Sequence, residues 1–310
     1  MRLIRRLAPR CLPGPGFVAT IGSYDGLHLG HRALLDRVQV QAGERGLASM
    51  VVTFEPLPRE YFAPQAPPAR LTTFRERWRL LERTQLDVFC ALHFSRSLQH
   101  LPGVDFARQL GFAGIRSVVV GHDFRAGRGG EATAEWLQAK GPGFGFDVEV
   151  LQPVLFGGVR VSSRGVREAL GRGDLASARD LLGRDYSMVG RVIRGAKLGR
   201  TLGFPTANLR LSRRRTPTDG IFAVRVCGVP GDSRRGSGRP GVASLGTRPT
   251  VNGTVPLLEA HIFDFDGDLY GREIEVQFVA RLRDELRFAT LDEMVVQMHR
   301  DAAAARAILS

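Results

Sequence analysis

Short apolar runs alternate with amphipathic segments along the first part of the chain. The runs are apolar at odd and even positions alike, as in strands that are buried on both faces of a parallel sheet, and they cover residues 17–23, 48–54, 86–94, 116–124 and 146–151. Helical spacing of apolar residues occurs between them, at 31–46, 74–84, 104–112 and 131–141. This alternation predicts an α/β domain of Rossmann-like type, a mostly parallel sheet with helices on both faces.

From Tyr186 onward the pattern changes to short β-like runs separated by turns. The runs cover residues 187–195, 220–228, 240–246, 257–265 and 272–282, and they predict a small antiparallel β-barrel or sandwich. Two short helices are expected before them, at 162–170 and 174–183, and a terminal helix follows at 290–309. Thr290 and Glu293 have the spacing of a capping box at its start. We therefore expect two domains, residues 1–183 and 184–310.

The composition narrows the class of partner. A net charge of +13 suggests a nucleic-acid partner. However, nearly all of the positive charge comes from arginine residues that are dispersed along the chain, so we expect no nucleic-acid partner. No apolar run reaches the roughly 18 residues of a membrane span, so we expect no membrane partner. Three distant cysteines without a C-x-x-C pair favour a reducing cytoplasm. The Arg-rich start, MRLIRRL, is either a first strand or part of a transit peptide, and a homo-oligomer is compatible with the sequence.

The stretch GSYDGLHLGH, residues 22–31, follows the first long apolar run. It lies where a strand of the predicted sheet ends, at the edge where such sheets bind ligands. Its glycines allow a sharp turn and a close approach to a ligand, and the N–H groups at the start of the next helix favour phosphate. His28 and His31 can point the same way and stabilise charge that develops in a transition state. The stretch predicts phosphoryl or nucleotidyl transfer by positioning and electrostatics.

Other interpretations remain open for these features. The histidines could belong to a metal site, although no third His or Cys lies nearby in the sequence, and the glycines could form only a turn. Gly127, Gly129 and Ala132 match the G-x-G-x-x-A pattern of a dinucleotide-binding oxidoreductase, with Glu149 about twenty residues further on. A basic regulator that binds flavin or nucleic acid without catalysis is the alternative from another class.

A second glycine-rich stretch, GRVIRGAKLGRTLGFPTAN, occupies residues 190–208. Thr206 and Asn208 flank Ala207, so both side chains can face one way on an extended backbone. Hydroxyl and amide oxygens are hard ligands that suit Mg²⁺. An ordinary turn rich in Gly and Pro is the alternative.

These motifs together resemble those of the bacterial bifunctional riboflavin kinase/FMN adenylyltransferases, the prokaryotic FAD synthetases. The first stretch is similar to the family's G-x-F-D-G-x-H-x-G-H signature, and TFEPLPREYF, VVVGHDFRAG and VSSRGVREAL follow. The second resembles the flavokinase signature, with ASLGTRPT, LLEAHIFDFDGDLYG and LRDELRF after it. The resemblance covers nearly the whole chain, and it implies an N-terminal nucleotidyltransferase domain and a C-terminal flavokinase-like barrel.

The resemblance implies that ATP phosphorylates riboflavin to FMN, and that AMP is then transferred from ATP to FMN to give FAD and pyrophosphate. For adenylyl transfer it implies His28 and His31 as catalytic residues and a nucleotide site at Gly22, Tyr24, Asp25, Gly26, His28, His31, Asp123, Ser163 and Arg167. The chain departs from the family pattern at Arg164, usually Thr, and at Ala126, usually aromatic. The departures leave an alternative, a riboflavin kinase whose adenylyltransferase domain is impaired.

For the kinase, the resemblance implies that Glu259 is the catalytic base for the 5′-hydroxyl of riboflavin. A primary alcohol must lose its proton as it attacks phosphorus, so the chemistry calls for such a base. The resemblance also implies ATP as co-substrate and Mg²⁺ as cofactor. The ATP site that it implies comprises Gly195, Gly199, Arg200, Thr206 and Asn208. Of these, Thr206 and Asn208 are the implied Mg²⁺ ligands. The implied flavin contacts are Arg283 and Glu285.

Overall fold

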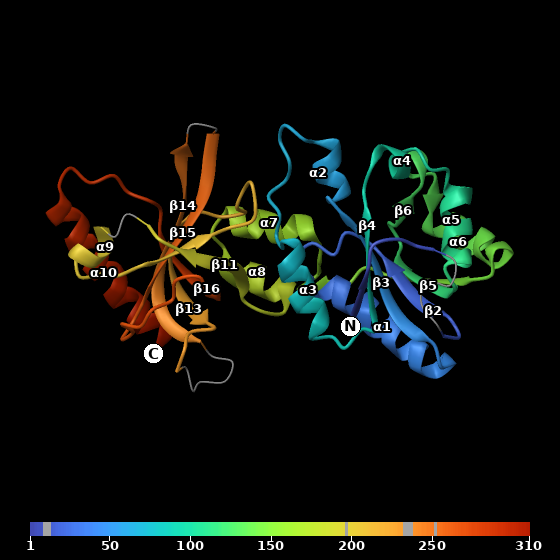
Figure 1. The fold of residues 1–310 in the computed structure, drawn as a ribbon, viewed down its shortest axis with the longest axis horizontal. Coiled ribbons are helices and arrows are strands. Elements are labelled where there is room, and N and C mark those ends of the chain that lie inside the picture. The colour runs from blue at the N-terminus through green and yellow to red at the C-terminus, as the bar shows by residue number, and fades with distance from the viewer. Residues whose placement is uncertain (9–13, 196–197, 232–237, 251–252) are drawn as a thin grey trace. The chain divides into compact units, whose positions relative to one another are not determined.

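The computed structural model describes residues 1–8, 14–195, 198–231, 238–250 and 253–310. The chain forms two compact units, which are best considered one at a time (Figure 1). The first comprises Met1–Pro68 and Phe74–Ser162, and the second comprises Ala69–Thr73 and Ser163–Ser310. The functional boundary that we expect between residues 183 and 184 stays a prediction.

A parallel sheet of six strands forms the centre of the first unit, in the order β1-β4-β3-β2-β5-β8. Each neighbouring pair in this order is parallel. The strands are β1 (Arg2–Ile4), β2 (Phe17–Ile21), β3 (Ala48–Glu55), β4 (Val88–His93), β5 (Ile115–Gly121) and β8 (Asp147–Leu151). The five strands predicted from the apolar runs are confirmed, and of the two interpretations of MRLIRRL the strand is the one observed, as edge strand β1.

Helices cover both faces of this sheet, as predicted. The helices are α1 (Leu29–Arg45), α3 (Phe74–Glu82), α5 (Gly103–Phe112) and α6 (Ala134–Lys140). Successive strand residues point to opposite faces, and so two cores form. The α1 and α3 side contains Leu35, Val38, Val51, Leu81 and Phe89, whereas the α5 and α6 side contains Ala19, Met50, Cys90, Leu110 and Leu137.

Several very short elements connect these strands and helices. They are too brief to produce a periodic sequence signal, and the sequence analysis does not predict them. They are α2 (Pro58–Phe62), α4 (Arg96–Gln99), β6 (Arg125–Ala126), η1 (Arg128–Gly130), β7 (Ala132–Thr133), η2 (Gly141–Phe144), β9 (Leu155–Phe156) and β10 (Val159–Arg160).

The second unit contains a closed antiparallel barrel in the order β11-β12-β15-β14-β13-β16. Of the barrel and the sandwich that the sequence allows, the barrel is the one observed. Its strands are β11 (Tyr186–Ile193), β12 (Ala207–Arg210), β13 (Gly220–Cys227), β14 (Arg239–Thr250), β15 (Gly253–Ile262) and β16 (Glu273–Arg283), and the short helix α9 (Leu198–Thr201) lies between β11 and β12. Alternate strand residues are buried in its interior, among them Met188, Leu209, Phe222, Leu245, Leu258 and Phe278.

Three further helices belong to this unit: α7 (Ser163–Gly171), α8 (Leu175–Leu182) and α10 (Leu291–Leu309). Ala305 and Leu309 of α10 pack on Ala223 and Phe263 of the barrel unit. The Oγ1 of Thr290 caps α10 by accepting a hydrogen bond from the Glu293 N–H at 3.2 Å. Of the helices in the described ranges, none combines the length and the apolar surface needed to cross a membrane.

The short segment Ala69–Thr73 is held against this unit through its carbonyl oxygens. Arg167 donates from Nε to the Ala69 oxygen at 2.7 Å. The Tyr186 hydroxyl donates to the Leu71 oxygen at 3.1 Å, and Arg213 donates to the oxygen of Arg70 at 3.3 Å. The segment is thus fixed by side chains from α7, from β11 and from the loop after β12.

Candidate functional site

The loop between β2 and α1 places His28 at the N-cap of α1. The Nδ1 of His28 accepts a hydrogen bond from the His31 N–H at 3.2 Å. A neutral ring with Nδ1 as acceptor carries its proton on Nε2, so Nε2–H is the donor group of a neutral His28. The two histidine rings stack with their centroids 3.6 Å apart and their planes at 16°. The loop therefore holds both imidazoles together at the positive end of α1.

Two glycines make room for this arrangement. A Cβ on Gly30 would lie 3.2 Å from the Cε1 and Nδ1 of His28, tighter than most side-chain contacts. A Cβ on Gly22 would lie 3.1 Å from the ring of Tyr24. Gly22 and Gly30 thus allow close packing of the Tyr24 and His28 rings on the backbone, in addition to the turn.

Tyr24 packs against the ring of His31. It is fully buried, and its hydroxyl is 2.5 Å from the Oγ1 of Thr20. Its ring lies 4.8 Å from the ring of His31, centroid to centroid. Its φ of 50° is uncommon for a residue with a side chain, and the surrounding contacts must compensate for that strain. Burial raises the pKa of Tyr24, which therefore stays a neutral hydroxyl.

The ring of His31 carries little charge in the free protein. Burial lowers the pKa of His31 well below its ordinary range, and the neighbouring His28 lowers it further. The Nδ1 of His31 is buried and has no hydrogen-bond partner among the described residues. A neutral imidazole still donates a hydrogen bond, so His31 can stabilise negative charge on a phosphate without acting as a base.

The other predicted nucleotide residues divide between the two units. Asp25 and Gly26 lie in the β2–α1 loop, where Asp25 is buried and Gly26 has a φ of 88°. Asp123 follows β5, the sheet neighbour of β2, so it lies at the same carboxyl edge, and it forms an ion pair with Arg160. Ser163 and Arg167 lie on α7 of the second unit, and their part in nucleotide binding stays a prediction.

The two departures from the family pattern, Arg164 and Ala126, lie outside the sequence of the β2–α1 loop. Arg164 donates from Nε to the Oε1 of Glu168 at 2.7 Å on the exposed side of α7, and 81% of its side chain is accessible. Ala126 lies in β6 and packs against the core on the α5 and α6 side of the sheet.

The structure argues against the dinucleotide interpretation of Gly127, Gly129 and Ala132. These residues belong to the β6–η1–β7 segment, where β6 and β7 pair as a short hairpin, rather than to a turn from a sheet strand into a helix. A Cβ on Gly127 would lie 2.7 Å from the Cα of Gly103, which explains that glycine by packing. The carboxylate of Glu149 is held by the Nε of Arg37 at 2.9 Å.

In the second unit, the glycines of residues 190–208 lie against the predicted ligands. A Cβ on Gly195 would lie 2.5 Å from the Oδ1 of Asn208, and a Cβ on Gly199 would lie 3.4 Å from the Oγ1 of Thr206. Asn208 is 6% exposed. Because glycine has no side chain, the backbone at Gly195 and Gly199 lies close to the Asn208 amide and the Thr206 hydroxyl. These groups supply two oxygen donors that suit Mg²⁺.

Glu259 lies next to Asn208 in the barrel. In the barrel, Asn208 of β12 is directly opposite Glu259 of β15, and Glu259 is directly opposite Ser244 of β14. Residues directly opposite each other share a face, with Cβ atoms about 5 Å apart. Leu258 and Ala260, the neighbours of Glu259, are buried in the barrel interior, so Glu259 faces outward. The predicted base and a predicted metal ligand therefore share the outer face.

Aromatic contacts fix the loop that carries Thr206. The ring of Phe204 is 5.1 Å from that of His261 on β15 and 4.9 Å from that of His299 on α10. The Nδ1 of His261 is 2.9 Å from the Pro205 oxygen, so its N–H can donate there. The Pro-Thr-Ala-Asn segment is thus anchored at its first residue.

The two residues predicted to contact flavin lie near the end of β16 and just after it. Glu285 accepts a hydrogen bond from the Ser244 hydroxyl at 3.2 Å, next to the Glu259 position. Arg283 binds Asp301 of α10, with Nη2–Oδ2 at 2.6 Å and Nε–Oδ1 at 2.9 Å. Arg283 therefore holds α10, and contact of either residue with flavin stays a prediction. Arg200 lies exposed in α9.

Sequence reasoning missed Ser244, His261 and Arg77. Ser244 and His261 become recognisable only from the strand register, which the sequence does not give. Arg77 did leave a signal: it follows Phe74 by three residues and precedes Leu81 by four, so it falls on the apolar face of its helix.

Comparison with known proteins identifies the family of both parts of the chain. The FAD synthetase family model matches residues 14–165, and the riboflavin kinase family model matches residues 182–309. A bifunctional riboflavin kinase/FMN adenylyltransferase from Escherichia coli is 45% identical over 296 residues, which cover 95% of this chain and 93% of that protein. The Haemophilus influenzae protein of the same name is 40% identical over 314 residues, the full length of both chains.

A solved structure shares the fold over the whole chain. A Streptococcus pneumoniae protein described as a macrolide-efflux protein has a TM-score of 0.81 at 29% identity and covers 98% of each chain. The description as a macrolide-efflux protein applies to the Streptococcus pneumoniae protein only. On the matches to both family models and to full-length relatives, this chain belongs to the bifunctional riboflavin kinase/FMN adenylyltransferase family.

Proposed function

We propose that this chain phosphorylates riboflavin to FMN with ATP in its second unit and adenylylates FMN to FAD in its first. The observation that carries the kinase half is the register that places Glu259 opposite Asn208. The observation that carries the adenylyltransferase half is the stacked pair of His28 and His31 at the N-terminus of α1. Membership of the family favours this bifunctional reading over a kinase alone.

The two reactions require different groups. In the kinase reaction the 5′-hydroxyl oxygen of riboflavin bonds to the γ-phosphorus, ADP leaves, and the hydroxyl proton passes to the carboxylate of Glu259. Thr206 and Asn208 would hold Mg²⁺, which when bound offsets the charge of the ATP phosphates. Arg200 adds a cation that can contact the same phosphates.

In the adenylyl transfer, a phosphate oxygen of FMN bonds to the α-phosphorus of ATP, and pyrophosphate leaves. The attacking oxygen is already deprotonated, so no base is needed. This explains why hydrogen-bond donors, rather than a carboxylate, are found at His28 and His31. Asp123 belongs to the proposed nucleotide site of the first unit, and the assignment of Ser163 and Arg167 to nucleotide binding stays a prediction. The proposal includes a cytoplasmic location, which the free cysteines Cys90 and Cys227 support.

The proposal is tested by incubating the purified chain with riboflavin, ATP and Mg²⁺ and separating the flavins by chromatography. Formation of FMN and then FAD is expected, and omission of Mg²⁺ should stop the kinase step. A reaction that stops at FMN would contradict the adenylyltransferase half. Absence of both FMN and FAD would contradict the kinase half, and FMN supplied directly then tests the other unit separately.

A further inference from the structure

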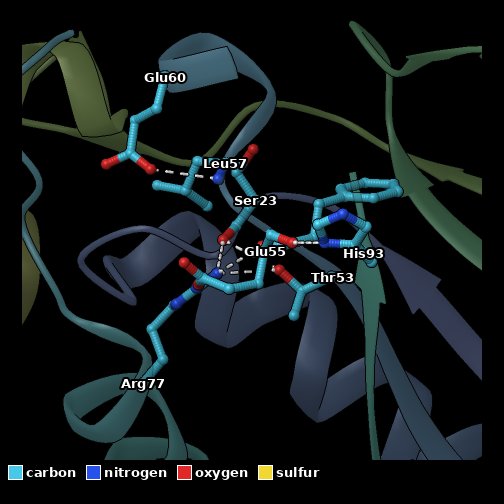
Figure 2. A network of polar contacts seen from close by, with 8 residues as sticks. Ser23, Thr53, Glu55, Leu57, Glu60, Arg77 and His93 are labelled. Carbon is cyan, nitrogen blue, oxygen red and sulfur yellow. Dashed lines mark hydrogen bonds and ion pairs between the residues drawn. The ribbon is translucent and has the colours of Figure 1, made fainter. Parts of the chain in front are cut away.

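Arg77 carries a buried positive charge that the proposed reactions do not explain. Its side chain is fully buried, in α3. Figure 2 shows its guanidinium directed at two segments of the first unit, the loop after β2 and the end of β3. A buried charge is costly unless it is paired and hydrogen-bonded, so such a residue needs a reason.

Arg77 and Thr53 donate to the same backbone oxygen, that of Ser23. Its Nη1 donates to the backbone oxygen of Ser23 at 3.0 Å and to the Oγ1 of Thr53 at 3.1 Å. The Thr53 hydroxyl itself donates to the same Ser23 oxygen at 3.2 Å. The Nη2 of Arg77 forms an ion pair with Glu55, which balances the charge. The Ser23 oxygen is therefore held by two donors that also hold each other.

The position of Ser23 gives this clamp its importance. Its carbonyl belongs to the peptide that precedes Tyr24, and the rotation about the next bond is the strained φ of Tyr24. Fixing that carbonyl fixes the peptide plane and so helps to maintain a conformation that would otherwise relax. Tyr24 in turn packs on His31, which stacks on His28.

We propose that Arg77 is a positioning residue for adenylyl transfer: by clamping the Ser23 carbonyl it sets the loop that carries His28 and His31. Glu55 neutralises its charge, so its action is geometric rather than a direct attraction of phosphate. The inference rests on the proposed adenylyltransferase activity of this unit. It assigns a function to a buried cation and to Thr53, both of which act through the Ser23 carbonyl.

The test compares Arg77→Met, Arg77→Lys and wild type in the full-length chain, with riboflavin phosphorylation as the internal control. Misplacing catalytic donors costs rate more than binding, so Arg77→Met should lower the kcat for FAD formation by about 10- to 100-fold. The KM values for FMN and ATP should change less than about threefold. Riboflavin phosphorylation should stay within about twofold of wild type, since the barrel is a separate unit. Arg77→Lys should recover part of the lost kcat.

Folding is checked in the same samples. Both tryptophans, Trp78 and Trp136, lie in the first unit, so their fluorescence reports its unfolding. If Arg77→Met unfolds that unit, Thr53→Val decides instead: it keeps the shape and the cation but removes one donor to Ser23. We expect it to lower the kcat of adenylylation by about three- to tenfold.

The outcomes distinguish the proposed adenylyltransferase activity from the positioning role of Arg77. A wild-type chain that makes no FAD from FMN would remove the proposed activity itself. A wild-type chain that makes FAD, with folded Arg77→Met equally fast, would overturn the positioning role and leave the activity intact. Equal kcat in wild type and Thr53→Val, where Arg77→Met cannot be measured, would overturn it too.

Discussion

Asn208 and Glu259 are direct partners across the β12–β15 pair, and their side chains share the outer face of the barrel. One residue supplies an amide oxygen that suits a metal and the other supplies a carboxylate. Phosphorylation of an alcohol needs both functions close together, because the metal neutralises the phosphates while the carboxylate takes the proton.

Glu259→Gln should therefore lower riboflavin phosphorylation by about 10²- to 10⁴-fold while preserving the size of the side chain. Formation of FAD from supplied FMN should be unaffected, because it takes place in the other unit. Both rates are measured in one preparation by chromatography of the flavins. Loss of both activities together would contradict separate sites, and Glu273→Gln, a change elsewhere on the barrel, is the matched control.

Gly195 is predicted to be intolerant of a single methyl group. In Gly195→Ala the new Cβ would lie 2.5 Å from the Oδ1 and 2.6 Å from the Cγ of Asn208, so the amide must move. We expect the KM for ATP in the kinase reaction to rise or its kcat to fall, by about tenfold or more.

The control for Gly195 is Gly171→Ala. There the nearest atom to the new Cβ is the Pro217 oxygen at 3.9 Å, an ordinary contact. Kinase activity should be unchanged in this variant. Equal activity in Gly195→Ala and Gly171→Ala would show that the close approach to Asn208 has no role in catalysis.

Local sequence predicts much of this architecture, because buried parallel strands and amphipathic helices leave periodic signals. It also predicts the β2–α1 turn, since glycine, histidine and aspartate cluster where a strand ends. It does not predict Ser244 opposite Glu259, because the register of distant strands depends on packing of the whole barrel. Nor does it distinguish Arg283 as a ligand contact from Arg283 as the partner of Asp301. That distinction requires knowing where α10 packs.

Arg164 tests whether a departure from the family pattern impairs adenylyl transfer. Its side chain is exposed and paired with Glu168 on the next turn of α7. Exposed ion pairs of this kind contribute little to the stability of a fold. Arg164→Thr should therefore leave the rate of FAD formation from FMN within about threefold of wild type. A larger increase would identify Arg164 as the cause of a weakened site. Glu168→Gln, which removes only the partner, shows whether the pair itself matters.

The low pKa of His31 predicts how the first unit responds to acid. In the unfolded chain a histidine takes up a proton near pH 6.5, whereas in the folded chain burial and His28 hold the pKa of His31 well below that value. Between these two pKa values the unfolded state binds more protons, so this residue makes the folded state less stable as the pH falls from about 6.5. Above about pH 6.5, His31 is neutral in both the folded and the unfolded state, and its contribution to stability is constant.

This pH dependence is measured by thermal unfolding followed through Trp78 and Trp136, from pH 7.5 down to about pH 5. The decrease in Tm with falling pH should be smaller in His31→Gln than in wild type. His100→Gln, which removes an exposed histidine of the same unit, should retain the wild-type decrease. An identical decrease in wild type and His31→Gln would mean that His31 titrates alike in the folded and unfolded chains, and the neutral state of His31 would then have to be abandoned.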